Sequence, residues 1–111
     1  MAEPKVKAGL WVQAALRLGA GDGRPGVVIH RGDADSGGIL VLLRGRAGLV
    51  ILSQTRDGEG NPAWLRAAGP DPVDEARADA YIEKQRRFDP DLWVIEFEAP
   101  DYVPPFEAKL L

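Results

Sequence analysis

Two short segments of this chain gather most of the side chains that could carry out chemistry. One covers residues 30–35 and the other residues 86–93. The candidate residues are His30, Arg31, Asp33, Asp35, Arg86, Arg87, Asp89, Asp91 and Trp93. Guanidinium and carboxylate groups form strong forked hydrogen bonds with each other, and guanidinium groups also recognise phosphate and carboxylate ligands. These residues could therefore hold a structural corner or line a binding site.

The structural interpretation of this polar cluster is favoured. The corner at residues 86–93 would use its aspartates to organise a turn and its tryptophan to fill the core. Its two arginines would pair with Asp33 or Asp35, because Arg–carboxylate forks often fix architecture. In the functional interpretation, the arginines stay free, and their guanidinium groups line a pocket that binds a phosphate or a carboxylate. Alternatively, Arg and Trp, which are enriched in binding hot spots, anchor an interface.

His30 is the only histidine, and histidine is the side chain that most often acts as a general base. It follows the apolar residues 27–29, which places it at the end of a strand. The sequence offers no obvious nucleophile to accompany it. We therefore interpret His30 as a structural residue in preference to a catalytic one.

Three fragments resemble well-known functional motifs, and each fails on context. Residues 35–38, Asp-Ser-Gly-Gly, are similar to the segment around a protease nucleophile, but a triad requires three residues in defined roles. Asp33 and Asp35 begin like a calcium-binding loop, yet Arg44 stands where a bidentate glutamate belongs. Residues 21–26 fit G-x-G-x-x-G, but they follow a helix and lead into a strand, the reverse of a dinucleotide-binding unit.

Composition limits the function classes further. The 111 residues include 45% hydrophobic and 28% charged side chains, which is typical of one small globular domain. There is no cysteine, which excludes disulfides, a thiol nucleophile and cysteine-ligated metals. The net charge of −3 argues against a protein that coats nucleic acid. We expect neither a cofactor nor a metal.

The apolar residues 8–18 follow Lys5 and Lys7 and faintly resemble a signal peptide. Gln13 and Arg17 interrupt this stretch, whereas the apolar core of a signal peptide is normally continuous. No run approaches the length needed to span a bilayer. We therefore expect a soluble cytoplasmic protein.

Hydrophobic periodicity predicts two helices and five strands. The first helix covers residues 8–19 and is apolar enough to be largely buried. The second covers residues 71–88, where Asp71 can cap and Asp74 stands at the acidic position of a capping box. Its residues 78, 81, 82, 85 and 88 fall on one face. Strands are predicted at residues 27–30, 39–43, 49–53, 63–67 (the weakest) and 92–98.

This order, α-β-β-β-(β)-α-β, predicts an α+β fold. We expect a two-layer arrangement with an antiparallel meander, both helices on one face and the final strand inserted beside an earlier one. Residues 1–111 form a single domain, with extended or flexible termini at 1–7 and 99–111. Residues 102–106 are expected to lie across an exposed sheet edge, which would protect that edge.

Three segments together are similar to one family of proteins. They are LWVQAALR at residues 10–17, RGDADSG at residues 31–37 and QRRFDPDLWV at residues 85–94. The chain resembles, over residues 8–98, a family of short alphaproteobacterial proteins of unknown function, domain-of-unknown-function family 1491. The resemblance implies a bacterial cytoplasmic setting. It transfers no activity and no functional residue, because the family has none assigned.

The sequence thus favours a non-enzymatic binding or adaptor module with a protein partner, which could be a second copy in a homodimer. The alternative is a small-anion-binding protein or an enzyme that uses His30, Asp33, Asp35, Arg86 and Arg87 in one accessible cleft. RNA binding through the two arginines is a weaker hypothesis, because it needs exposed aromatic residues near a basic stripe. No membrane association is expected.

Overall fold

A computed structural model describes residues 7–111. The predicted terminus at residues 1–7 falls outside the described residues except for Lys7. The elements are α1 (Ala8–Gly21), β1 (Gly26–His30), β2 (Ile39–Gly45), β3 (Gly48–Arg56), β4 (Pro62–Arg66), α2 (Glu75–Phe88) and β5 (Trp93–Glu98). The predicted α+β class and element order are confirmed. Within residues 7–111, no helix is both long enough and apolar enough to cross a membrane.

The five strands form one sheet in the order β1-β5-β2-β3-β4. β5 is inserted between β1 and β2, antiparallel to the first and parallel to the second. The insertion of the final strand beside an earlier one is therefore confirmed. The meander is shorter than predicted, because only β2, β3 and β4 follow one another as antiparallel neighbours. β1 is separated from β2 and becomes an edge strand.

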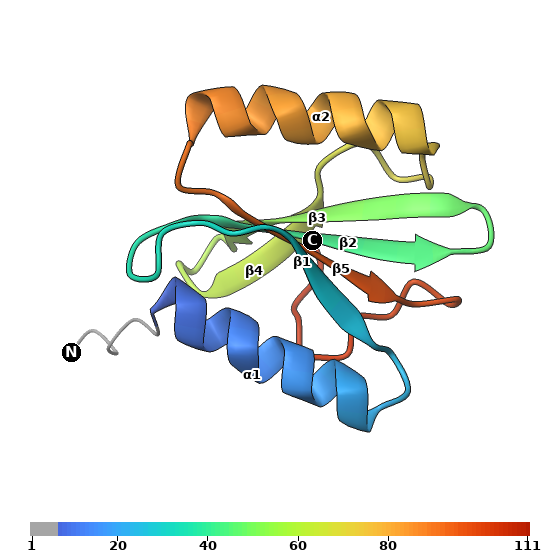
Figure 1. Cartoon of the computed structure of the whole chain (residues 1–111), viewed down its shortest axis with the longest axis horizontal. Coiled ribbons are helices and arrows are strands. Elements are labelled where there is room, and N and C mark those ends of the chain that lie inside the picture. The colour runs from blue at the N-terminus through green and yellow to red at the C-terminus, as the bar shows by residue number, and fades with distance from the viewer. Residues whose placement is uncertain (1–6) are drawn as a thin grey trace.

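The predicted two layers are wrong, because the helices lie on opposite faces of the sheet (Figure 1). In β2, Val41 and Leu43 belong to the core that includes Val12 of α1. Leu42 points the other way, into the core that includes Ile82 of α2. Alternate residues of a strand face opposite sides. A strand buried on both faces needs a layer on each side, and the uninterrupted apolar run 39–43 has this property.

α1 is less buried than predicted. Its buried residues are Ala8, Val12, Ala15 and Gly19, whereas Leu10 and Leu18 remain 59% and 53% exposed. Only one stripe of α1 contacts the sheet, and small residues on that stripe bring the helix close. A Cβ on Gly19 would lie 2.8 Å from the ring of Phe97. Glycine is therefore required at this contact.

α2 begins four residues later than predicted. The carboxylate of Asp74 accepts a hydrogen bond of 2.8 Å from the Arg77 N–H, which makes Asp74 the N-cap. Before it, the N–H and C=O of Val73 both bond to Leu49. Because Val73 is held in this isolated bridge to β3, the helix cannot start at residue 71. At the other end, Phe88 is 76% exposed and does not join the buried face.

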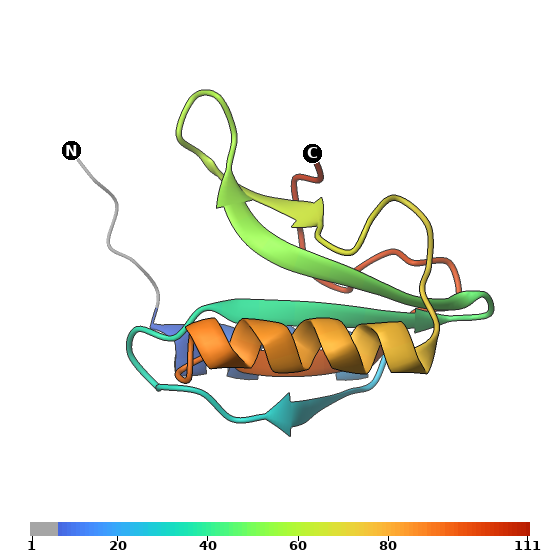
Figure 2. The same cartoon turned by 90° about the horizontal axis from the view of Figure 1, so that it is seen from above.

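The C-terminal tail lies along β4, the last strand of the sheet (Figure 2). The Trp64 N–H donates to the Lys109 carbonyl at 2.8 Å, and the Leu111 N–H donates to the Trp64 carbonyl at 2.9 Å. Phe106 anchors the tail in the core, with its ring centroid 4.9 Å from that of Trp11 and 5.4 Å from that of Trp64. The β4 edge is thus covered by the chain itself.

Phe106→Ala should lower the free energy of unfolding by about 3–5 kcal/mol, because it empties a buried aromatic site that fastens the tail. The matched control is Phe88→Ala, where the ring is exposed and the expected change is within about 0.5 kcal/mol. Urea unfolding followed by tryptophan fluorescence measures both. Equal losses in the two variants would contradict the anchoring role of Phe106.

Candidate functional site

The loop after β1 is organised by the side chain of Asp33. Its carboxylate accepts hydrogen bonds from the Asp35 N–H at 3.0 Å, from the Ser36 N–H at 2.9 Å and from the Ser36 hydroxyl at 3.0 Å. The backbone hydrogen bonds from Ser36 and Asp35 lower the pKa of Asp33 from its ordinary value. This carboxylate is therefore committed to the turn.

The loop is joined to the corner that precedes β5. The Asp33 N–H donates to the Asp91 carbonyl at 3.0 Å, and the indole N–H of Trp93 donates to the Asp33 carbonyl at 2.7 Å. The Arg31 guanidinium lies 5.4 Å from the centroid of the Trp93 ring, within cation–π range. At the corner itself, the carboxylate of Asp89 accepts from the Asp91 N–H at 3.0 Å. Trp93 is buried in the core on the α1 side.

Two glycines that the sequence analysis did not select make this junction sterically possible. A Cβ on Gly32 would lie 2.2 Å from the Asp91 carbonyl oxygen, and one on Gly37 would lie 2.1 Å from the same atom. Any side chain there would push the loop off the corner. The signal in the sequence was that these glycines flank an aspartate turn. A sequence alone does not say which part of the backbone such glycines approach.

The predicted pairing of Arg86 and Arg87 with Asp33 or Asp35 is wrong. Arg87 pairs with Glu83 on its own helix at 3.3 Å, and Asp35 pairs with Lys7 at 3.5 Å. The Nη1 atom of Arg86 lies 3.5 Å from Nε2 of His30. Since the arginine can only donate, the His30 nitrogen would accept in this weak contact.

The sheet explains why the nine candidates do not form one cluster. The loop at residues 31–36 contacts the start of α1, where the Gly9 N–H donates to the Ala34 carbonyl. Trp93 faces the same side. Arg86 and Arg87 belong to α2, on the opposite face (Figure 1). The candidates are therefore divided between two faces, apart from the contact of Arg86 with His30 at the end of β1.

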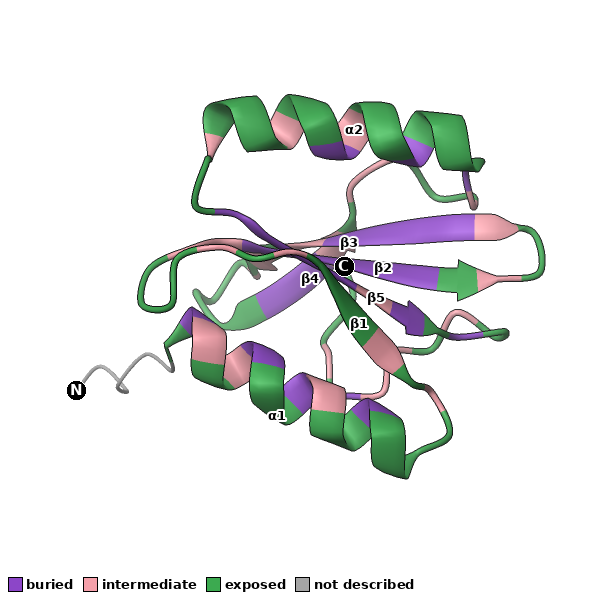
Figure 3. Cartoon of the chain, viewed as in Figure 1, coloured by how far each residue is buried: buried purple, intermediate pink, exposed green. Residues whose placement is uncertain are grey.

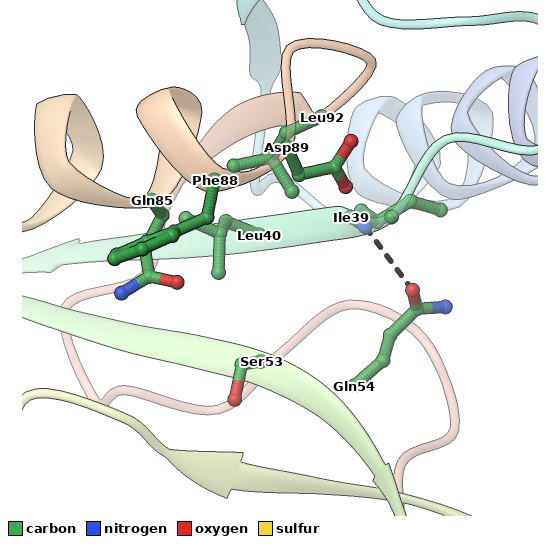
Figure 4. A pocket seen from close by; sticks show the side chains of 9 residues that line it. Ile39, Leu40, Ser53, Gln54, Gln85, Phe88, Asp89 and Leu92 are labelled. Atoms are coloured by element: carbon green, nitrogen blue, oxygen red, sulfur yellow. Dashed lines mark hydrogen bonds between the residues drawn. The ribbon is translucent and has the colours of Figure 1, made fainter.

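A hollow of about 180 Å³ opens beneath the C-terminal end of α2 (Figure 4). Phe88 and Gln85 border it from the helix, and Leu40 and Ser53 border it from the sheet. Among the nine candidates only Asp89 lines it. Its volume is below the roughly 300 Å³ of the smaller ligand pockets. Within residues 7–111, no three His, Asp or Glu side chains are grouped to hold a metal ion.

The most exposed apolar surface of the sheet is β1, which the sequence analysis did not select. Val27, Val28 and Ile29 are 56%, 40% and 42% exposed, and Figure 3 shows the contrast with the buried strands beside it. A run of three large apolar residues normally indicates a buried strand. Here the run is exposed because β5 takes the interior position beside β2.

The backbone of β1 also has groups on its outer side that no residue of the described part of the chain pairs. The Glu98 N–H donates to the Pro25 carbonyl at 3.0 Å, and Val27 lies opposite Glu96 in the same ladder. Residues in an antiparallel pair alternate between hydrogen-bonded and non-hydrogen-bonded positions. Gly26 and Val28 therefore direct their N–H and C=O groups outward. A register irregularity between Val28 and His30 ends the regular ladder.

Gly37→Ala should lower the free energy of unfolding by about 2–3 kcal/mol, because the new Cβ collides with a backbone oxygen that cannot move without breaking the corner. Gly58→Ala is the control, since a Cβ there has no neighbour within 4 Å. Thermal unfolding compares the two. A melting temperature for Gly37→Ala as high as that of the control would show that this contact is not rigid.

Comparisons with known proteins agree with this fold. A family model described as "Protein of unknown function (DUF1491)" matches residues 6–107. The crystal structure of a DUF1491 family protein from Caulobacter crescentus is similar, with 29% identity and a TM-score of 0.84, covering 96% of this chain and 100% of that one. The NMR structure of a DUF1491 family protein from the same organism gives 28% identity and a TM-score of 0.83, covering 98% and 99%.

A solution structure from A. tumefaciens has the same fold, with 22% identity, a TM-score of 0.78 and 95% of each chain covered. No curated protein matches the chain. The family model covers nearly all of the residues, and the resemblance predicted from three segments is confirmed. This chain belongs to the DUF1491 family, whose function is unknown.

Proposed function

We propose that this chain is a non-enzymatic binding module of the bacterial cytoplasm and that it engages a protein partner by pairing a strand with β1. The observation that carries this proposal is the exposed apolar edge at Val27, Val28 and Ile29. The bacterial setting is supported by the relatives from Caulobacter and A. tumefaciens.

The two edges of the sheet are treated differently. The β4 edge exchanges two hydrogen bonds with the tail, because the Trp64 N–H donates to Lys109 and the Trp64 carbonyl accepts from Leu111. The β1 edge carries outward backbone groups beside apolar side chains, the combination that supports binding by strand addition. Proteins generally protect such edges with charges, prolines or covering segments, because exposed edges promote association. A β1 strand of this composition is therefore best explained by a partner that covers it.

The polar cluster supports this function indirectly. The bonds between the loop at residues 31–38 and the corner before β5 hold the C-terminal end of β1 against its neighbour. Main-chain recognition requires an edge whose backbone is already ordered, since ordering it on binding would cost affinity. In this proposal, Asp33 and Trp93 are positioning residues.

Val28→Lys should abolish binding of the partner, because an edge lysine is a strong obstacle to strand pairing. The matched control is Val103→Lys, where the valine is also exposed, at 50%, but lies in the tail. The wild type and the two variants, at equal levels, serve as baits for affinity capture from the native organism. The proteins that each bait retains are then compared. The proposal predicts partners that are retained by the wild type and by Val103→Lys and lost only by Val28→Lys. An identical set of captured proteins from all three, together with a wild type that stays monomeric at about 1 mM, would contradict it.

A further inference from the structure

We propose that the strand that covers β1 is β1 of a second copy, so that the two sheets join into one continuous sheet across a two-fold axis. This inference rests on the proposed use of the β1 edge and names its occupant. Two features of the edge favour a second copy: the register that its outward groups allow and the packing of its side chains.

The outward backbone groups of Gly26 and Val28 define the register. In an antiparallel pair, two outward-facing residues exchange N–H···O=C bonds when they lie opposite each other. A two-fold axis at Val27 places Gly26 opposite Val28 of the second copy. By symmetry, it also places Val28 opposite Gly26 of the second copy. All the outward groups of both residues are then satisfied. The strand is self-complementary in this register, as an isologous interface requires.

The side chains agree with this register. Gly26 faces the α1 side, where a Cβ would lie 2.6 Å from the ring of Phe97 and 2.9 Å from Leu16. Because Gly26 has no side chain, its neighbour across the new ladder can be large. Val28 of the second copy would lie there, beside the half-buried Leu16. Each copy would thereby cover an apolar residue of the other.

Both ends of β1 carry charges of mixed sign. Before the strand, Arg24 pairs with Asp22 at 2.7 Å and with Asp101 at 2.8 Å, which leaves this end with a net charge of about −1 from its formal groups. After the strand, Arg86 reaches His30 and Arg31 lies over Trp93. The carboxylates of Asp33, Asp89 and Asp91 accompany these two guanidinium groups in the adjoining loop and corner. Charge therefore does not select the second copy, and the register and the side-chain packing carry the inference.

The interface is expected to be weak. The irregularity after Val28 limits the regular ladder to the first part of β1, so the contact belongs with small, transient interfaces. We expect dimerisation to become measurable between about 10 µM and about 1 mM protein.

Sedimentation equilibrium of the full chain tests the proposal. The wild type should change from 12.0 kDa to twice that mass over this concentration range. Val28→Pro should remain monomeric, because it removes an outward N–H without removing a bond to β5, whereas Val103→Lys should behave like the wild type. A wild type that is monomeric at about 1 mM would overturn the inference. Equal dimerisation of Val28→Pro and the wild type, with the variant folded, would overturn it as well.

Amide hydrogen exchange on the wild type gives a second measurement that requires no variant, in case Val28→Pro does not fold. Exchange at Gly26 and Val28 should slow as the protein concentration rises, while exchange at Val27, whose N–H faces β5, should not change. No concentration dependence at Gly26 and Val28 would contradict self-pairing. The proposed function fails separately: a monomeric protein whose captured partner is lost only in Val28→Lys would refute the second copy and retain the binding edge.

Discussion

β5 lies between β1 and β2, and its place there determines both the layering of the molecule and the position of the exposed edge. Its residues alternate between two buried faces, with Ile95 and Phe97 toward α1 and Val94 toward α2. A strand buried on both faces stabilises the sheet only if each face is covered, so one helix packs on each side. The same insertion displaces β1 from the centre of the sheet to its edge.

Several of the polar residues selected from the sequence help to hold β5 in this position. The parallel pairing of β5 with β2 requires a crossover, and the chain makes it through α2. At the end of that crossover, Asp91 and Trp93 bond to Asp33 in the loop that leaves β1. Gly32 and Gly37 allow the two backbones to approach. The junction thus fixes where β5 enters the sheet and, with it, the orientation of the edge strand beside it.

Much of the fold could be predicted from local patterns, because element type depends mainly on periodicity and capping. The limits of the prediction have identifiable physical causes. The helix at residues 71–88 loses its first four predicted residues to a contact between Val73 and Leu49, which are distant in sequence. The apolar run at residues 39–43 already indicated burial on two faces, and it was the available signal for a third layer.

The candidate site was harder to predict than the fold. The pairing of Arg86 with Asp33 or Asp35 assumed that residues with complementary charges would meet, but Asp33 binds its own turn and Asp35 pairs with Lys7. The run at residues 27–29 resembles a buried strand, and its exposure follows only from strand order. Strand order is a property of long-range pairing, which local periodicity does not encode. The exposed apolar edge could therefore be found only in the three-dimensional structure.

The most direct test of the self-pairing edge is a disulfide across its axis. The chain contains no cysteine, so Val27→Cys introduces a single thiol at the point where the two strands would be closest. A non-hydrogen-bonded antiparallel pair has a Cα separation of about 4.5 Å, within the range that a disulfide spans. Our account predicts that mild oxidation converts Val27→Cys to a covalent dimer far faster than it converts Val103→Cys. Equal rates of dimer formation in the two variants would contradict it.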